Sequence, residues 1–248
     1  MHPILFTIGN FNFYTHGLVA VLGIILAAFV TNLLAKKQKL DTEFFFDNIV
    51  FTTLFGIIGA RITYFVIYRD QFSSWKQIID LQDGGLVSYG GFILGGLCFW
   101  LLLRKQKQPV LKWFDLFSVG FFLGLSLGRI GDLFAGEYNG VYSERSLGFI
   151  GAYNIVPVSF YEAILCFCIF LAMLLLYRKR SKQFLTGELL FTSVSLYSFG
   201  RFILDFWRTE SKVFLSLSIG QIVSMVIFFI SVILLIKVKR EGRKNGIN

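Results

Sequence analysis

The chain has 248 residues, of which 55% are hydrophobic, 16% are charged and only three are prolines. Its apolar residues form long blocks instead of one stripe or one face, which excludes an ordinary soluble domain. The net charge of +9 resides in short basic clusters between these blocks. Such clusters indicate membrane topology and anionic lipid headgroups, and they argue against a nucleic-acid partner. The composition therefore predicts an all-α, polytopic integral membrane protein in contact with the lipid bilayer.

Cys98, Cys166 and Cys168 all lie inside apolar blocks and lack the paired spacing of a disulfide or a zinc site. We expect buried free thiols. The N-terminal residues include neither a basic region nor a small-residue cleavage site, so no removable signal peptide is expected.

Seven apolar segments follow one another along the chain, and we expect them to form one transmembrane domain over residues 1–248. Each has about 18 to 23 residues, which is enough to cross ~30 Å of hydrocarbon as a helix. The sixth is diluted by Glu188 and several serines. The predicted segments are 16–35, 46–68, 86–103, 113–134, 158–177, 184–206 and 217–236.

Basic clusters occupy alternate connections between these segments, at 36–39, 104–112, 178–182 and 237–244. Lysine and arginine favour the cytoplasmic side of a membrane. The pattern therefore predicts seven transmembrane helices with the N-terminus outside and the C-terminus in the cytoplasm. The opposite connections carry only Arg69, Lys76, Arg145, Arg208 and Lys212.

Three arginines, Arg61, Arg129 and Arg201, lie inside segments that run from the inner to the outer side. Counting ~1.5 Å per residue from the inner ends gives depths of roughly 22, 24 and 26 Å. Ionisable residues at such depths mark functional sites by default. We expect one polar layer in the outer half of the membrane, which would also include His16, Tyr89, Tyr161 and Glu162.

The spacing of polar residues reinforces this layer. Arg201, Asp205 and Arg208 fall on one face of a helix, and Tyr64 lies near Arg61 in the same way. A purely structural salt-bridge network is one interpretation. The other is binding of a phospholipid headgroup, because a guanidinium matches phosphate oxygens with two parallel hydrogen bonds. The carboxylates available as arginine partners are Asp132, Glu137, Glu162 and Asp205.

Two residues are candidates for proton transfer at this level. Tyr89 lies between two pairs of glycines, which are also typical of tight helix packing. His16 begins the first segment, where an interfacial role is the alternative. For each residue, a structural role and a catalytic role are both compatible with the sequence.

Residues 128–137 read Gly-Arg-Ile-Gly-Asp-Leu-Phe-Ala-Gly-Glu. They resemble the signature of the prolipoprotein diacylglyceryl transferases, which is close to Gly-Arg-(Ile/Leu)-Gly-Asn-Phe-(Ile/Met)-Asn-Gly-Glu. Further blocks resemble that family in the same order, from about Gly9 to the seventh segment. They are 59–64, 83–85 with 90–91, Pro157 with 161–162, Arg201 with Asp205 and Arg208, and 220–222.

The resemblance implies transfer of a diacylglyceryl group from phosphatidylglycerol to the lipobox cysteine of a secreted preprolipoprotein, in a bacterial cytoplasmic membrane. Arg129 and Arg201 would hold the phosphate, Glu137 and Gly140 would shape the pocket, and Glu162 with Asp205 would orient the arginines. No metal site, nucleotide loop or serine triad is apparent, and the implied chemistry needs no cofactor. The polar layer and the resemblance together give His16, Tyr89, Arg129 and Arg201 as the expected catalytic residues. The expected residues for binding phosphatidylglycerol are Arg61, Tyr64, Arg129, Asp132, Glu137, Gly140, Tyr161, Glu162, Arg201, Asp205 and Arg208.

The chain departs from the family pattern at several of these positions. Tyr89 replaces a histidine often proposed as the base, and His16 replaces a tyrosine. Asp132 replaces the signature asparagine, Val156 replaces a histidine before Pro157, and the outer segment 140–156 is short. These departures leave the acceptor open. The alternatives are a diverged paralogue that transfers a lipid-derived group to another acceptor and a non-catalytic phospholipid-binding protein.

Overall fold

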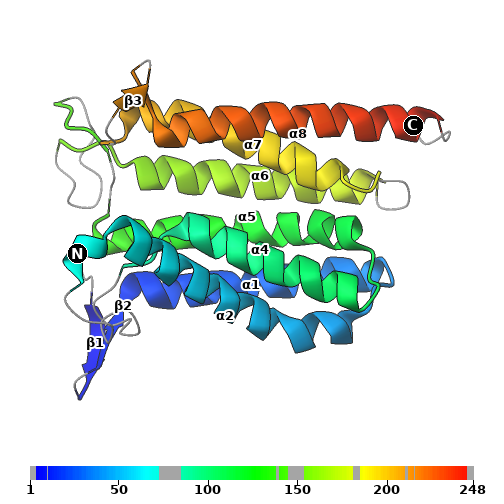
Figure 1. The fold of residues 1–248 in the computed structure, drawn as a ribbon, viewed down its shortest axis with the longest axis horizontal. Coiled ribbons are helices and arrows are strands. Elements are labelled where there is room, and N and C mark those ends of the chain that lie inside the picture. Colours follow the sequence, from blue (N-terminus) through cyan, green and yellow to red (C-terminus); the bar gives the residue numbers. More distant parts are fainter. Residues whose placement is uncertain are drawn as a thin grey trace. The chain divides into compact units, whose positions relative to one another are not determined.

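The computed structural model describes residues 4–9, 11–72, 85–137, 140–144, 154–180, 185–209, 212–214 and 216–244. Several features named above fall outside these ranges: Lys76, Asp83 with Gly84, residues 145–153 of the outer segment and residues 181–182 of a basic cluster. Seven α-helices carry the described part of the chain (Figure 1). They are α1 (Thr15–Lys37), α2 (Thr42–Ile67), α4 (Ser88–Lys105), α5 (Val110–Ala135), α6 (Val158–Arg180), α7 (Glu188–Leu204) and α8 (Ile219–Lys244).

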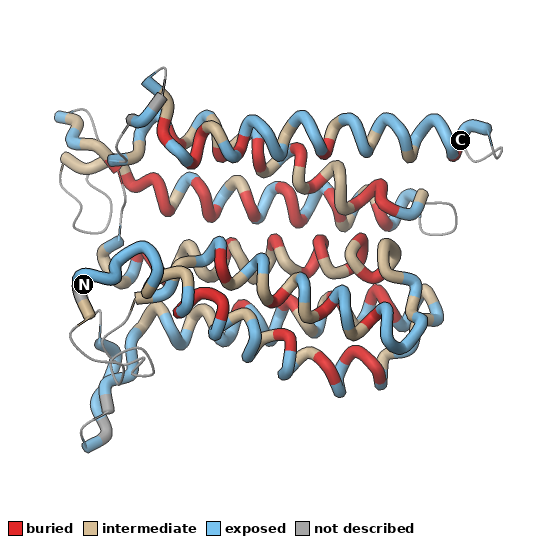
Figure 2. Tube along the Cα trace, in the orientation of Figure 1, coloured by how far each residue is buried: buried red, intermediate tan, exposed pale blue. Residues whose placement is uncertain are grey.

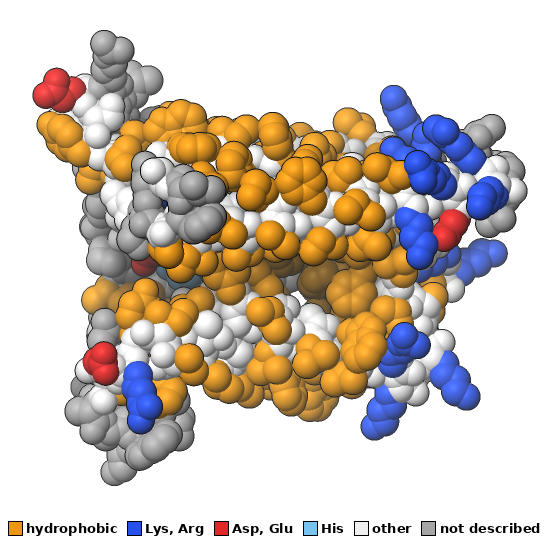
Figure 3. Space-filling view, turned by 45° about the horizontal axis from the view of Figure 1, so that its top comes forward, with side chains coloured by type: hydrophobic (Ala, Val, Ile, Leu, Met, Phe, Trp, Pro, Cys, Tyr) orange, Lys and Arg blue, Asp and Glu red, His pale blue; other side chains and the backbone are white. Residues whose placement is uncertain are grey.

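Six of these helices are long and apolar enough to cross a membrane, which confirms a helical, multi-pass membrane protein. The remaining helix, α4, is not among the six and carries Arg104 and Lys105 in its last turn. Apolar side chains lie exposed along the helices, such as Ile93 at 71% and Val66 at 69% (Figures 2 and 3). Exposure of this kind is expected where lipid, not water, surrounds a helix.

Two antiparallel hairpins accompany the helices and were not predicted. The first pairs β1 (Ile4–Ile8) with β2 (Phe11–Tyr14), and the second pairs β3 (Lys212–Phe214) with β4 (Leu217–Ser218). Two short 3₁₀ turns, η1 (Arg69–Gln71) and η2 (Asp205–Trp207), follow α2 and α7.

Helix boundaries follow local capping chemistry as well as hydropathy. The second helix begins at Thr42, before the apolar run, because the Asp41 side chain accepts a hydrogen bond from the Phe44 N–H at 3.0 Å. The helix α7 begins at Glu188, later than the predicted residue 184. It follows Gly187, whose φ of 97° lies in the left-handed region that glycine adopts without a steric penalty.

The chain forms two compact units, Ala35–Trp113 and the combination of Met1–Leu34 with Phe114–Asn248. In the Ala35–Trp113 unit, α2 packs on α4 through glycine contacts, and a Cβ at Gly59 would lie 2.4 Å from the Gly90 carbonyl oxygen. The Trp113 ring stacks on Phe45 at 5.4 Å between centroids and is fully buried. A single domain over the whole chain stays a prediction.

In the other unit, α1 and α5 also meet at their backbones. A Cβ at Gly23 would lie 2.7 Å from the Gly124 carbonyl oxygen. Small residues allow such close approach between helices in a membrane, where packing and hydrogen bonds replace the hydrophobic effect. The contact brings the first turn of α1 beside the last turn of α5, since Gly131 lies against the His16 backbone.

Hydrogen bonds from buried polar side chains connect the remaining helices of this unit. Ser126 on α5 donates to the Ala163 carbonyl of α6 at 2.9 Å. The two helices α7 and α8 pack on each other, with Ser195 and Ser231 hydrogen-bonded at 3.0 Å. Asp115 on α5 caps α7 by accepting from the N–H groups of Gly187 and Leu190, at 2.5 and 2.8 Å. These contacts fix α5, α6 and α7 relative to one another.

Candidate functional site

The site is organised around Glu162, which lies in the first turns of α6. The Glu162 side chain is fully buried. Arg201 on α7 donates from Nη1 to Glu162 Oε1 at 2.5 Å. Arg129 on α5 places its Nε 3.2 Å from Glu162 Oε2, and Arg208 places its Nη2 3.3 Å from the same oxygen. Arginines from separate segments of the chain therefore converge on one carboxylate.

Asp205 contacts two arginines, Arg201 on α7 and Arg208 just after the η2 turn. Its Oδ1 lies 3.0 Å from Arg201 Nε and 3.5 Å from Arg208 Nε. The predicted helical stripe was wrong in one respect, because α7 ends at Leu204 and Asp205 begins the η2 turn. The tighter turn still brings Arg208 back to Asp205 and Glu162.

Asp132 lies in the last turn of α5 and links Arg129 to His16. Arg129 Nη1 donates to Asp132 Oδ2 at 2.8 Å. The other carboxylate oxygen, Oδ1, lies 2.6 Å from His16 Nδ1. Only 5% of the Asp132 side chain is exposed, compared with 46% for His16. The histidine therefore lies at the accessible edge of the cluster.

We call these three arginines and three carboxylates the arginine–carboxylate cluster. Their positive and negative charges are equal in number. Paired charges are what a membrane interior requires, so pairing alone is compatible with a structural network. Arg129 is the most accessible guanidinium, with 17% of its side chain exposed compared with 7% for Arg201 and 10% for Arg208. The cluster comprises Arg129, Asp132, Glu162, Arg201, Asp205 and Arg208.

Sequence reasoning missed Tyr197 and Ser159. The Tyr197 hydroxyl donates to Glu162 Oε1 at 2.9 Å, and its position four residues before Arg201 on α7 was the available signal. Ser159 donates from its hydroxyl to the Glu137 carbonyl at 2.7 Å, which ties the end of the signature segment to the start of α6.

Gly140 follows the signature and joins the segment that carries Arg208. The backbones of Gly140 and Arg208 form an isolated antiparallel bridge, and the Val141 N–H donates to the Trp207 carbonyl at 2.8 Å. A Cβ at Gly140 would lie inside contact distance of the Val156 carbonyl oxygen. Only glycine fits against Val156 at this position.

Replacing Gly140 by alanine is therefore expected to displace the segment around Val156 and to lower the free energy of unfolding by about 1–3 kcal/mol, as overpacking does. Transfer activity should fall with it. Thermal unfolding in detergent and turnover measure the two effects. Gly96→Ala is the matched control, because a Cβ there meets nothing within 4 Å. Equal stability of both variants would contradict the steric argument.

Three of the predicted site residues belong to the Ala35–Trp113 unit. Arg61 is buried, donates from Nη1 to the Gly85 carbonyl at 2.9 Å and lies 5.7 Å from the Tyr64 ring centroid. Tyr89 lies in the first turn of α4 with 50% of its surface exposed. Their convergence with the arginine–carboxylate cluster stays a prediction.

Two further predicted residues flank the cluster in sequence. Tyr161 precedes Glu162 on α6, but 46% of it is exposed and its ring packs against Phe160 at 5.9 Å. Glu137 is exposed, and its backbone N–H donates to the Asp132 carbonyl at 2.8 Å.

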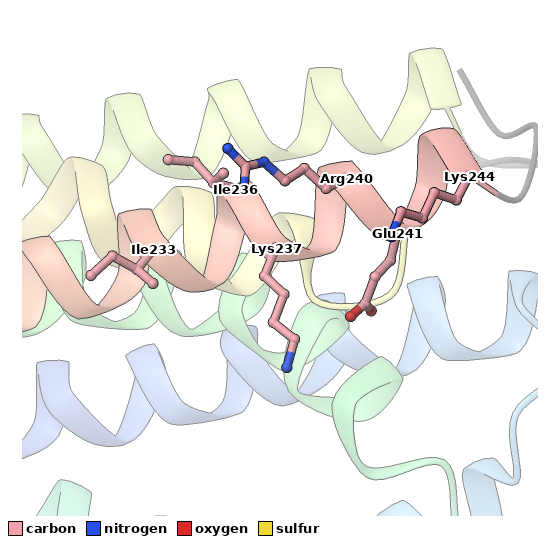
Figure 4. Close-up of a pocket in the computed structure, with 6 residues that line it drawn as sticks. All are labelled: Ile233, Ile236, Lys237, Arg240, Glu241 and Lys244. Carbon is pink, nitrogen blue, oxygen red and sulfur yellow. The ribbon is translucent and has the colours of Figure 1, made fainter.

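A cavity of about 390 Å³ lies at the basic end of α8 (Figure 4). Its lining comes from one helix, so it is a depression of the surface. At ~1.5 Å per residue it begins roughly 20 Å along α8 from Ile219, remote from the arginine–carboxylate cluster. The lining residues are Ile233, Ile236, Lys237, Arg240, Glu241 and Lys244.

Comparisons with known proteins cover nearly the whole chain. Residues 3–237 match the family model described as prolipoprotein diacylglyceryl transferase. The phosphatidylglycerol--prolipoprotein diacylglyceryl transferase 1 of Clostridium perfringens (strain 13 / Type A) is 29% identical, over 98% of this chain and 97% of the relative. The phosphatidylglycerol--prolipoprotein diacylglyceryl transferase of Finegoldia magna (strain ATCC 29328 / DSM 20472 / WAL 2508) is 30% identical, over 97% of each chain. The chain therefore belongs to the prolipoprotein diacylglyceryl transferase family.

Proposed function

We propose that this protein transfers the diacylglyceryl group of phosphatidylglycerol to the lipobox cysteine thiol of a preprolipoprotein. The thiol sulfur forms a bond to the glyceryl carbon, the bond from that carbon to the phosphate oxygen breaks, and glycerol phosphate leaves with the electron pair. The thiol proton passes to a base. The family membership and the names of the relatives support this reaction.

Electrostatics gives the arginines a role in this reaction. A phosphodiester carries one negative charge, and the departing glycerol phosphate carries two. Fixed cations around the phosphate stabilise the charge that develops in the transition state, and their effect is strong where water is excluded. Arginine suits this task because its fork stays charged and contacts two oxygens at once.

The observation that carries the proposal is the convergence of Arg129, Arg201 and Arg208 on Glu162. Arg129 contacts two carboxylates of the cluster, and its guanidinium has five N–H donors in all. The contacts described for Arg129 use its Nη1 and Nε atoms. We propose that the phosphate binds Arg129, the most exposed arginine of the cluster, and reaches Arg201.

The other predicted residues fill supporting roles in this proposal. Glu162 and Asp205 orient the arginines, while Glu137 and Gly140 shape the pocket after the signature. His16 and Tyr89 are the two candidates for the base. Additional contacts to the headgroup come from Arg61, Tyr64, Asp132, Tyr161 and Arg208.

The proposed topology places this chemistry at the outer leaflet of a bacterial cytoplasmic membrane. Counting α4 as a span gives seven crossings, with the N-terminus outside. The basic last turns of α1 and α6 then lie in the cytoplasm, as the distribution of lysine and arginine favours. The start of α6 and the end of α7, which hold the site, lie near the outer surface.

Turnover of phosphatidylglycerol vesicles against a lipobox peptide tests the proposal. The purified protein should release glycerol phosphate and add the mass of a diacylglyceryl group to the peptide, while a peptide with serine in place of the cysteine should stay unmodified. Release without peptide modification would favour a paralogue with another acceptor. Lipid binding without release would favour a non-catalytic phospholipid-binding protein.

A further inference from the structure

We infer that His16 and Asp132 form a catalytic dyad in which Asp132 positions the imidazole and His16 accepts the thiol proton through Nε2. This inference rests on the proposed transfer reaction. It selects one base from the two candidates and assigns a positioning role to the residue that replaces the signature asparagine. The two departures from the family signature are in direct contact, at 2.6 Å between His16 Nδ1 and Asp132 Oδ1.

Helix packing brings the two residues together. His16 lies in the first turn of α1, and Asp132 lies in the last turn of α5. A Cβ at Gly131 would already lie 3.4 Å from the His16 Cα, so a small residue at that position allows the two helix ends to approach. The dyad is therefore built on two helices whose backbones touch.

The contact favours one tautomer of the imidazole. His16 Nδ1 lies 2.6 Å from the carboxylate without hydrogen-bond geometry, and because a carboxylate accepts but does not donate hydrogen bonds, this approach favours the proton on Nδ1. That nitrogen, Nδ1, is buried, although 46% of the His16 side chain is exposed. The accessible part of the ring is therefore the part that carries Nε2, which is unprotonated in the neutral tautomer and able to accept a proton.

Asp132 connects the base to the phosphate site. Its Oδ1 contacts His16, and its Oδ2 accepts from Arg129 Nη1 at 2.8 Å. A thiol that reaches Nε2 therefore lies beside the arginine proposed to hold the phosphate. The charged groups that act electrostatically on His16 are Asp132, Glu137 and Arg129.

Every proton and electron pair in this step has a destination. The thiol gives its proton to His16 Nε2 as sulfur attacks the glyceryl carbon, and glycerol phosphate leaves with the electrons of the broken carbon–oxygen bond. The imidazolium ion beside Asp132 is stabilised by the carboxylate, and it releases its proton to water after the product leaves.

The test compares His16→Asn, Asp132→Asn and the double variant in full-length protein, with phosphatidylglycerol vesicles and a lipobox peptide. Asparagine at position 16 still offers an N–H to Asp132 but has no base, so kcat should fall about 100-fold or more. Its affinity for phosphatidylglycerol should stay within about threefold, because the arginines are unchanged. His16→Gln is the second variant and carries the same expectation.

Asp132→Asn tests the positioning role. An asparagine amide donates to Nδ1 and holds the wrong tautomer, so kcat at saturating lipid should fall about 100-fold or more. Because both residues act in one step, the double variant should be within about threefold of His16→Asn. A merely structural contact would instead be rescued by asparagine at position 16.

Activity of both position-16 variants within about threefold of the unmodified protein would overturn the dyad, as would losses in the double variant that multiply. Thermal unfolding of every variant identifies failure to fold. An unmodified protein that transfers nothing would instead refute the proposed function, so the two failures are distinguishable.

Discussion

Replacing Glu162 by glutamine is expected to reduce diacylglyceryl transfer by about 100-fold or more and to lower the free energy of unfolding by about 3–5 kcal/mol. The Glu162 carboxylate is fully buried and is shared by Arg129, Arg201 and Arg208. Its removal leaves three guanidiniums with only Asp132 and Asp205 as counter-ions, and the glutamine NH₂ group adds donors where only acceptors are wanted.

Thermal unfolding in detergent and turnover of phosphatidylglycerol check this expectation. Glu43→Gln is the matched control, because Glu43 is an exposed carboxylate in the first turn of α2. Phosphatidylglycerol should raise the unfolding temperature of the Glu162 variant more than that of the unmodified protein, since the freed arginines gain an anion. Unchanged stability together with unchanged turnover would contradict the central role of Glu162.

The second large effect is expected from Arg129→Lys, which should lower kcat/KM by about 10²–10³. Lysine keeps the positive charge but loses the planar fork, so it cannot contact Asp132, Glu162 and a phosphate oxygen together. Arg129 contacts both carboxylates here and is the most accessible arginine of the cluster. The loss should therefore appear in phospholipid binding and in turnover.

Arg69→Lys is the matched control for this substitution, because Arg69 is an exposed arginine in the η1 turn. Binding of phosphatidylglycerol to the purified variants, measured beside peptide modification, separates affinity from turnover. Transfer by Arg129→Lys within about threefold of the unmodified protein would show that charge alone, without the guanidinium geometry, meets the requirement of the reaction.

Much of this fold was predictable because a spanning helix needs a long apolar run, which is visible in one dimension. Hydropathy alone misplaced the helix ends that capping decides, at Asp41 and Gly187. The first hairpin had a local signal that was overlooked. Strand residues flank a turn at Gly9, whose φ is 61°, and a Gly-Asn turn between such residues is typical of a hairpin.

The charged members of the arginine–carboxylate cluster were visible in the sequence, but the connections between them were not. Intramembrane arginines and carboxylates stand out in an apolar sequence, and the pairs Arg129 with Asp132 and Arg201 with Asp205 follow from helical spacing. The sharing of Glu162 depends on the register between α5, α6 and α7. The periodicity of one sequence shows which residues share a face of one helix. It does not show how far neighbouring helices are shifted along their axes, which is the register that matters here.

The direct backbone contact between α1 and α5 limits how a phospholipid enters the protein. A methyl group at Gly23 would already collide with the Gly124 carbonyl, and an acyl chain is wider than a methyl group. The seam is therefore closed to hydrocarbon tails at this height. A phospholipid whose headgroup reaches Arg129 therefore does not pass an acyl tail between α1 and α5 at the height of Gly23 and Gly124.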